Sequence, residues 1–236
     1  MFHSLLLQIP ADTLSDSLNR IVQPAAQQAP EQLSLWFLIK EGGILMIPLG
    51  ICSILAVYYF FERFFAIRKA GKTPADFMLR VKEKITEGNI QGARSLCRNY
   101  EGALPQIIGK GISRIGKPID HIEKSMENTG KLEVYHMEKN LGVLHTIAGI
   151  APMFGFLGTI AGMIILFSNI QQTNRFEIGV IAGGIYTKMV TSAVGLIIGL
   201  MAYMAYNYLN ALINKNVNKM EIASNELLDM LHEPAH

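Results

Sequence analysis

Three apolar stretches, each about as long as a membrane is thick, limit what this chain of 236 residues can fold into. They begin at Ile44, near Leu141 and at Ile178. A bilayer's hydrocarbon core, about 30 Å thick, is spanned by roughly 20 apolar residues in an α-helix. With 50% hydrophobic and 17% charged residues, little apolar sequence remains for a separate soluble core. The sequence predicts an all-α integral membrane protein with three transmembrane helices and long helical cytoplasmic extensions.

The distribution of lysine and arginine sets the expected orientation. Only Arg20 and Lys40 precede the first span, and the connection between the second and third spans carries only Arg175. Four basic residues follow the first span closely: Arg63, Arg68, Lys69 and Lys72. Because cytoplasmic loops carry an excess of Lys and Arg, we expect the N-terminus outside and the C-terminus in the cytoplasm.

The ends of the apolar stretches divide the chain into seven expected segments. They are an outer N-terminal segment with a short interfacial helix (1–43), the first transmembrane helix (44–62), a cytoplasmic helical region (63–140), the second transmembrane helix (141–169), an outer loop (170–177), the third transmembrane helix (178–208), and a cytoplasmic C-terminal helix and tail (209–236). In the cytoplasmic region, helical periodicity predicts amphipathic helices broken near Gly88 and at Gly116 and Pro118. Trp36 is expected at headgroup depth.

The sequence shows no arrangement typical of catalysis or of cofactor binding. The six histidines are scattered, and the chain has no glycine-rich phosphate loop. Cys52 lies in the first span and Cys97 in the following region, on opposite sides of the predicted topology, so both are interpreted as packing residues. The net charge of +2 gives no reason to expect nucleic acid. We therefore expect no enzyme activity, no cofactor and no metal.

Small residues recur at helical spacing in the second and third predicted helices. They are Gly155, Gly158 and Gly162 in the second helix and Gly184, Gly195 and Gly199 in the third. In lipid, small residues let helix backbones approach closely, so these glycines are the expected helix-packing positions.

Hydroxyl side chains accompany these glycines. Lys188, Thr191 and Ser192 share the stripe of the third helix, and Thr159 lies close to the stripe of the second. Such a stripe faces protein or water instead of lipid, so several copies of the chain can line an axial cavity with it. The alternative is that Thr159 bonds a carbonyl group one turn back and only packs.

The stretch IAPMFGFLGTIAGMI at 150–164, with the small-residue stripe of the third helix, resembles the MotA/TolQ/ExbB proton-channel family, most closely its ExbB and TolQ members. The segments ERFFAIRKA (62–70) and GNIQGARSLC (88–97) are similar to the family's exit from the first helix and to its cytoplasmic hairpin. Three spans favour ExbB or TolQ over MotA, which has four.

The resemblance implies a proton-channel subunit in the inner membrane of a Gram-negative bacterium, with a periplasmic N-terminus and a cytoplasmic C-terminus. It implies a homopentamer around the transmembrane helices of a dimeric, single-span ExbD-like partner. Proton flow then drives motion of that partner and, through a TonB-like protein, energises transport across the outer membrane. A TolQ-like or motility-motor subunit of the same machine type is the alternative, and a non-conducting membrane scaffold is a third hypothesis.

The resemblance also assigns pore residues. The family's pore threonine in the second helix falls on Thr159, and its counterpart in the third helix falls on Ser192. Family members commonly carry a Glu five residues before that second hydroxyl, where this sequence has Thr187 followed by Lys188. No acidic residue lies in the third span, so a proton-carrying carboxylate has to come from the partner. The expected proton pathway comprises Thr159, Ser192, Thr191, Lys188 and Thr187.

Lys188 is the ionisable group of the third predicted helix. At about 100° per residue it lies about 40° from Ser192, whereas Thr187 lies about 140° away. Counted from Ile178 at about 1.5 Å per residue, Lys188 is about 15 Å deep. Two interpretations remain open: it faces the pore or a neighbouring subunit, or its long stem reaches the outer interface. An intramembrane lysine, which costs about 2.5–3.5 kcal/mol on insertion scales, argues against a pure scaffold.

Overall fold

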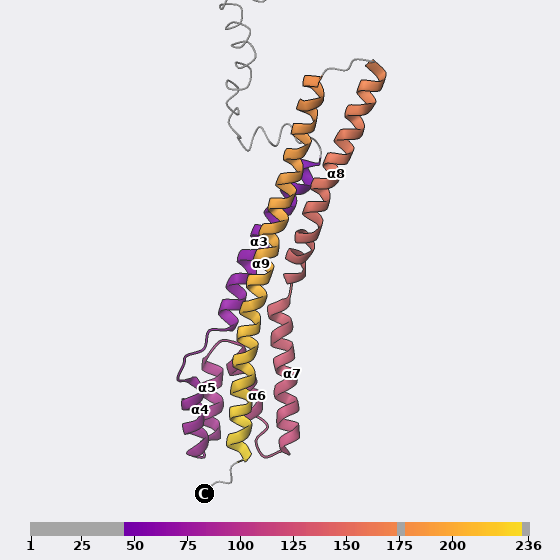
Figure 1. Cartoon of the computed structure of the whole chain (residues 1–236). Helices are drawn as coiled ribbons and strands as arrows, with labels where there is room; N and C mark the ends of the chain where they lie inside the picture. Colours follow the sequence, from indigo (N-terminus) through magenta and orange to yellow (C-terminus); the bar gives the residue numbers. More distant parts are fainter. Residues whose placement is uncertain (1–44, 174–177, 233–236) are drawn as a thin grey trace, which may run out of the picture. The chain divides into compact units, whose positions relative to one another are not determined.

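Every regular element in the described part of the chain, residues 45–173 and 178–232, is a helix. In this computed structural model they are α3 (Met46–Ala70), α4 (Phe77–Thr86), α5 (Ile90–Asn99), α6 (Ala103–Ile112), α7 (Ile119–Glu138), α8 (Leu141–Thr173) and α9 (Ile178–His232), as Figure 1 shows. The interfacial helix expected around Trp36 lies outside the described residues.

Three of the described helices are long and apolar enough to cross a membrane, which confirms the predicted number of spans. They are α3, residues Leu141–Gln172 of α8 and residues Ile181–His232 of α9. Helix α9 has 55 residues, which at about 1.5 Å each makes it about 80 Å long, far more than a bilayer core needs. No glycine or proline follows Gly199 in this helix, so nothing in its sequence ends it at the membrane surface.

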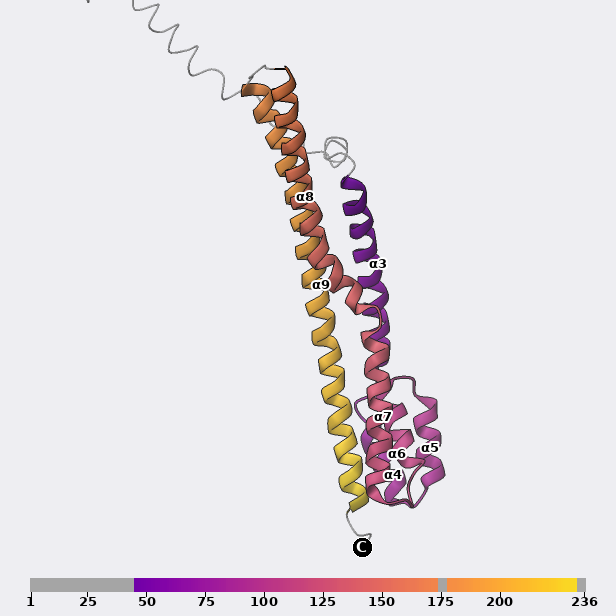
Figure 2. The same cartoon turned by 90° about the vertical axis from the view of Figure 1, so that its right-hand side faces the viewer.

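The helices α4 to α7 gather around the C-terminal part of α9 (Figures 1 and 2). Their apolar faces form a hydrophobic core in which the side chains of Phe77, Ile108 and Leu227 are at most 1% exposed. The predicted breaks are present: Gly88 has a φ of 71° after α4, and Gly116 has a φ of 95° before α7. Glycine adopts this left-handed backbone without steric cost, which separates the helices.

Buried polar contacts tie the three long helices to this core. Arg63 of α3 is 7% exposed, and its Nη1 donates a hydrogen bond to the carbonyl oxygen of His136 in α7 at 3.3 Å. Its guanidinium also forms an ion pair with Glu62. On α9, Nδ2 of Asn216 donates to the carbonyl oxygen of Ile67 at 3.2 Å. A buried guanidinium needs such partners, so these contacts fix α3 against α7 and α9.

Candidate functional site

Helices α8 and α9 run antiparallel and pack along a line of glycines, here named the α8–α9 seam (Figure 2). The seam glycines are Gly155, Gly158, Gly162, Gly184, Gly195 and Gly199. A β-carbon placed on Gly195 would lie 2.7 Å from the carbonyl oxygen of Ala151 and 2.9 Å from Cα of Gly155. These distances are shorter than van der Waals contact, so only glycine permits this approach of the two backbones.

The other seam glycines meet the opposite helix in the same way. A β-carbon on Gly199 would lie 2.5 Å from Cγ of Pro152, and one on Gly184 would lie 3.0 Å from Cδ1 of Leu166. All six glycines named from the sequence therefore contact the other helix of the same chain. Close backbone packing of this kind is what holds helices together in lipid.

Two of the expected pathway residues lie in the seam itself. Thr191 is 1% exposed, and its methyl group lies 3.2 Å from the position of a β-carbon on Gly158. The half-buried Lys188 lays its aliphatic stem over Gly162, where a β-carbon would collide with Cγ, Cδ and Cε of the lysine. Thr187 is part of α9, but its side chain is outside the described ones.

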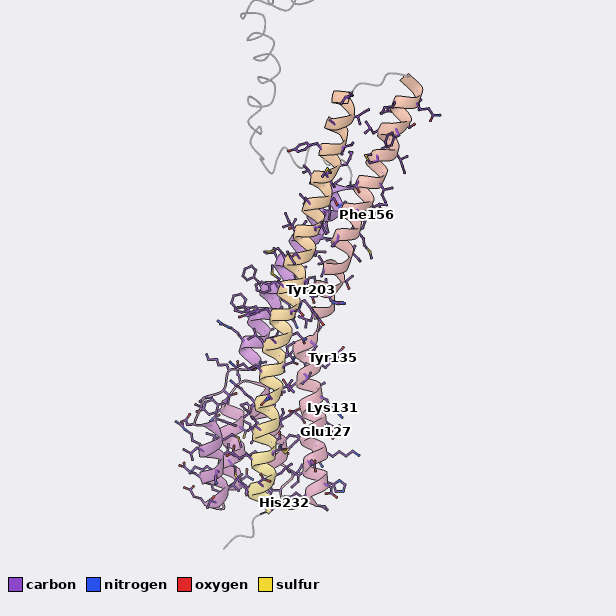
Figure 3. The ribbon with its side chains drawn as sticks, viewed as in Figure 1. Glu127, Lys131, Tyr135, Phe156, Tyr203 and His232 are labelled. Carbon is purple, nitrogen blue, oxygen red and sulfur yellow. The ribbon has the colours of Figure 1, made fainter. Side chains whose placement is uncertain are left out.

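The hydroxyl residues Thr159 and Ser192 lie beside the seam. Oγ1 of Thr159 donates a hydrogen bond to the carbonyl oxygen of Phe156, labelled in Figure 3, at 2.7 Å, which is the local bond expected of a packing threonine. Thr159 lines one shallow groove and Ser192 lines another, and the two grooves share Ile160. The structure thus brings both hydroxyl residues to the same side of the seam, about one turn from Lys188.

Most of the membrane-spanning surface has no cover within a single chain. Only 11% of the most apolar window of α3 is buried, and 22% of the corresponding windows of α8 and α9. Large apolar side chains beside the two grooves are exposed, among them Met153 (69%), Phe156 (63%) and Leu196 (57%). Apolar surface of this extent needs lipid or further protein against it.

The structure also pairs two residues that the sequence analysis did not single out. The imidazole of His145 on α8 lies beside the phenol ring of Tyr206 on α9, with ring centroids 5.0 Å apart. The signal that could have found them is the antiparallel register, because each lies 14 residues from a hydroxyl residue, Thr159 or Ser192. That register is visible only once the seam is known.

The cysteines are apart and unreactive in the described structure. Cys97 is 6% exposed, and its β-carbon packs 3.0 Å from the position of a β-carbon on Gly109. Burial raises the pKa of its thiol to about 11, so the sulfur stays protonated at neutral pH. Cys52 on α3 is half-buried, and both thiols are free.

Comparison with known proteins gives the family. Residues 99–222, more than half of the chain, match the MotA/TolQ/ExbB proton channel family. The chain is 23% identical over 186 residues to a biopolymer transport protein ExbB homolog of Methanothermobacter thermautotrophicus, covering 78% of this chain and 66% of that protein, just under two thirds of its length. It is 21% identical over 221 residues to the Tol-Pal system protein TolQ of Pseudomonas aeruginosa, covering 87% and 96%.

A further relative is the biopolymer transport protein exbB1 of Vibrio cholerae, 23% identical over 193 residues, covering 80% of this chain and 84% of that protein. The matched family comprises proton channels and is not a known enzyme family. The match reaches from the end of α5 through α8 and most of α9, so it includes the whole seam with its hydroxyl residues. This chain, a multi-pass membrane protein, belongs to the MotA/TolQ/ExbB proton channel family.

Proposed function

We propose that this chain is the channel-forming subunit of an ion-driven energy transducer in the inner membrane, with a role like that of ExbB. Five copies surround a pore that holds the transmembrane helices of a dimeric ExbD-like partner. Proton flow moves the partner and energises TonB-dependent transport across the outer membrane. The N-terminus is periplasmic, and helices α4 to α7 with the C-terminus are cytoplasmic.

The side-by-side placement of Thr159 and Ser192 is the observation that carries this proposal. The glycine seam holds α8 and α9 together, and both hydroxyl residues line grooves on one side of that helix pair. Hydroxyls on a pore wall hold water or meet a partner's polar group. The uncovered apolar side chains beside them supply the surface that neighbouring copies and the partner helices cover.

A TolQ-like role is the second candidate, because the TolQ relative is matched over 96% of its own length. The two roles are distinguished by complementation. The ExbB-like role predicts restored TonB-dependent uptake in a strain that lacks its ExbB, whereas the TolQ-like role predicts restored outer-membrane integrity in a strain that lacks TolQ.

The test of the proposal is purification of the chain with its single-span partner, followed by native mass spectrometry and reconstitution into liposomes. We expect five copies of this chain with two of the partner, and a proton flux that follows the imposed gradient. An assembled complex that never conducts protons would favour the scaffold hypothesis. A chain that purifies without any single-span partner would do the same.

The hydroxyl pair gives the first variant test. The double variant Thr159→Val and Ser192→Ala keeps approximate side-chain volume, so the oligomer should survive, while proton flux in liposomes should fall at least about tenfold because the pore wall loses its water-binding groups. Thr146→Val is the matched control, since Oγ1 of Thr146 on the same helix donates a similar local bond, to the carbonyl oxygen of Gly142 at 2.9 Å. Unchanged flux in the double variant would reduce both residues to packing.

Orientation is tested by cysteine labelling. A cysteine at Asn174, outside the described residues, should react with an impermeant thiol reagent added to spheroplasts, and a cysteine at Lys117, between α6 and α7, should react only after lysis. The expectation follows from the concentration of basic residues after the first span. Cys97 and Cys52 are first replaced by serine and alanine to remove background labelling. Labelling in the opposite order would invert the topology.

A further inference from the structure

The pair His145–Tyr206 lies on the hydroxyl side of the α8–α9 seam. His145 precedes Thr159 by 14 residues on α8, and Tyr206 follows Ser192 by 14 residues on α9. At about 100° per residue, each step of 14 residues returns to within about 40° of its starting face. Because the helices are antiparallel, both steps run toward the same end of the pair, about 21 Å away at 1.5 Å per residue. The ring contact, at 5.0 Å between centroids, agrees with this register.

That end of the helix pair is the one that joins the core of α4 to α7. Helix α8 begins there at Leu141, which belongs to that core together with Leu144. Leu144 is fully buried, whereas the neighbouring side chain of His145 is exposed. The imidazole therefore points away from the packed interior, and a role as a core histidine does not account for its position.

His145 has a chemistry that no other residue of this region offers. In the described parts of residues 141–214 on α8 and α9, the other ionisable side chains are Lys188 and tyrosines, and no acidic residue is present. Lysine and tyrosine ordinarily titrate near 10, whereas imidazole titrates near pH 6.5 and has two ring nitrogens that can take up and release a proton. His145 is thus the one group there that is suited to exchange protons with water at physiological pH.

The surroundings leave the imidazole available for that exchange. The elements packed against this end of α8 are α3 and α9. The charged groups of α3 at this level, Glu62 and Arg63, are paired with each other, and Arg63 is also held by the carbonyl oxygen of His136. The phenols of α9 there are Tyr203, Tyr206 and Tyr208, of which Tyr208 stacks on Phe64 of α3. Tyr206 alone has a ring contact with His145.

We propose that His145 is the proton-transfer residue at the cytoplasmic mouth of the pore and that Tyr206 is its positioning residue. One ring nitrogen accepts a proton from pore water that has passed Thr159 and Ser192, and the other releases a proton to water on the side of α4 to α7. Exchange of the remaining ring proton with water restores the first tautomer, so each cycle moves one proton and leaves the imidazole unchanged. This assignment rests on the proposed channel function.

The test is proton flux through the complex with its partner in liposomes. In His145→Ala the flux should fall about tenfold, in keeping with the loss of a positioned proton-transfer group, and the oligomer should remain intact because the side chain is exposed. Free imidazole added on the side of α4 to α7 should restore most of the flux, a rescue that a structural role would not produce. His121→Ala, which removes another exposed histidine, on α7, is the matched control and should conduct normally.

Tyr206 variants separate orientation from chemistry. Tyr206→Phe keeps the ring that contacts His145 and should retain the flux, whereas Tyr206→Ala should lower it several-fold without responding to imidazole to the same extent as His145→Ala. Normal flux in His145→Ala, or a loss that imidazole does not reverse, overturns the proton-transfer assignment while the channel function stands. If the unmodified complex does not conduct at all, the proposed function itself fails.

Discussion

Gly195→Leu is expected to abolish the assembled complex, leaving the chain inserted in the membrane but migrating as smaller species in native gels. The atoms that meet a side chain at this position are backbone atoms: the carbonyl oxygen of Ala151 at 2.7 Å and Cα of Gly155 at 2.9 Å. Overpacking costs about 1–3 kcal/mol where neighbours can adjust. Backbone atoms of a helix cannot rotate away, so α8 and α9 must separate and the grooves beside the seam are lost.

The seam also predicts a graded series. Gly158→Leu should be milder than Gly195→Leu, because its nearest neighbour is the methyl group of Thr191, a side-chain atom, at 3.2 Å. Gly179→Leu is the control on the same helix, since nothing lies within 4 Å of a β-carbon there. Native gels and thermal melting of the purified complex measure the order. Equal behaviour of Gly195→Leu and Gly179→Leu would show that the seam is not a packing interface.

The number of spans and the positions of the seam glycines could be predicted because lipid imposes a simple rule on each. Every spanning backbone must satisfy its own hydrogen bonds, so about 20 apolar residues mark a helix. Small residues at helical spacing mark a face on which backbones approach. Periodicity identifies such a face but not its partner. Only the structure shows that Gly155 meets Gly195 of the same chain.

Register and local bonding explain what the sequence analysis missed. His145 and Tyr206 are 61 positions apart in the chain, and their contact depends on how α8 and α9 slide along each other, which a one-chain hydropathy pattern does not contain. The predicted segments 178–208 and 209–236 are joined in one helix, α9, that continues to His232. The composition shifts at the membrane surface, but the backbone does not.

Lys188→Met should leave the oligomer intact and lower energised transport to about a tenth or less. The stem of Lys188 packs over Gly162 in the seam, and methionine, also unbranched and flexible, can occupy that space without the charge. Removing the ammonium also relieves an insertion cost of about 2.5–3.5 kcal/mol, so stability should be unchanged or higher. A charge kept at that cost beside Thr159 and Ser192 is expected to act in transport, by pairing with a partner carboxylate and stabilising its anionic form.

A swap of neighbouring residues distinguishes this role from that of a lysine whose stem merely reaches the outer interface. Met189, next along α9, is 63% exposed and lies about 100° around the helix from Lys188. The double variant Lys188→Met and Met189→Lys keeps composition and charge but moves the ammonium out of the seam. An interfacial anchor works from either position, because both stems reach the same depth. A pathway residue does not, so proton flux should stay as low as in Lys188→Met, while Lys188→Arg should retain part of it. Full transport by Lys188→Met, or its recovery in the swapped variant, would show that the ammonium only anchors the helix.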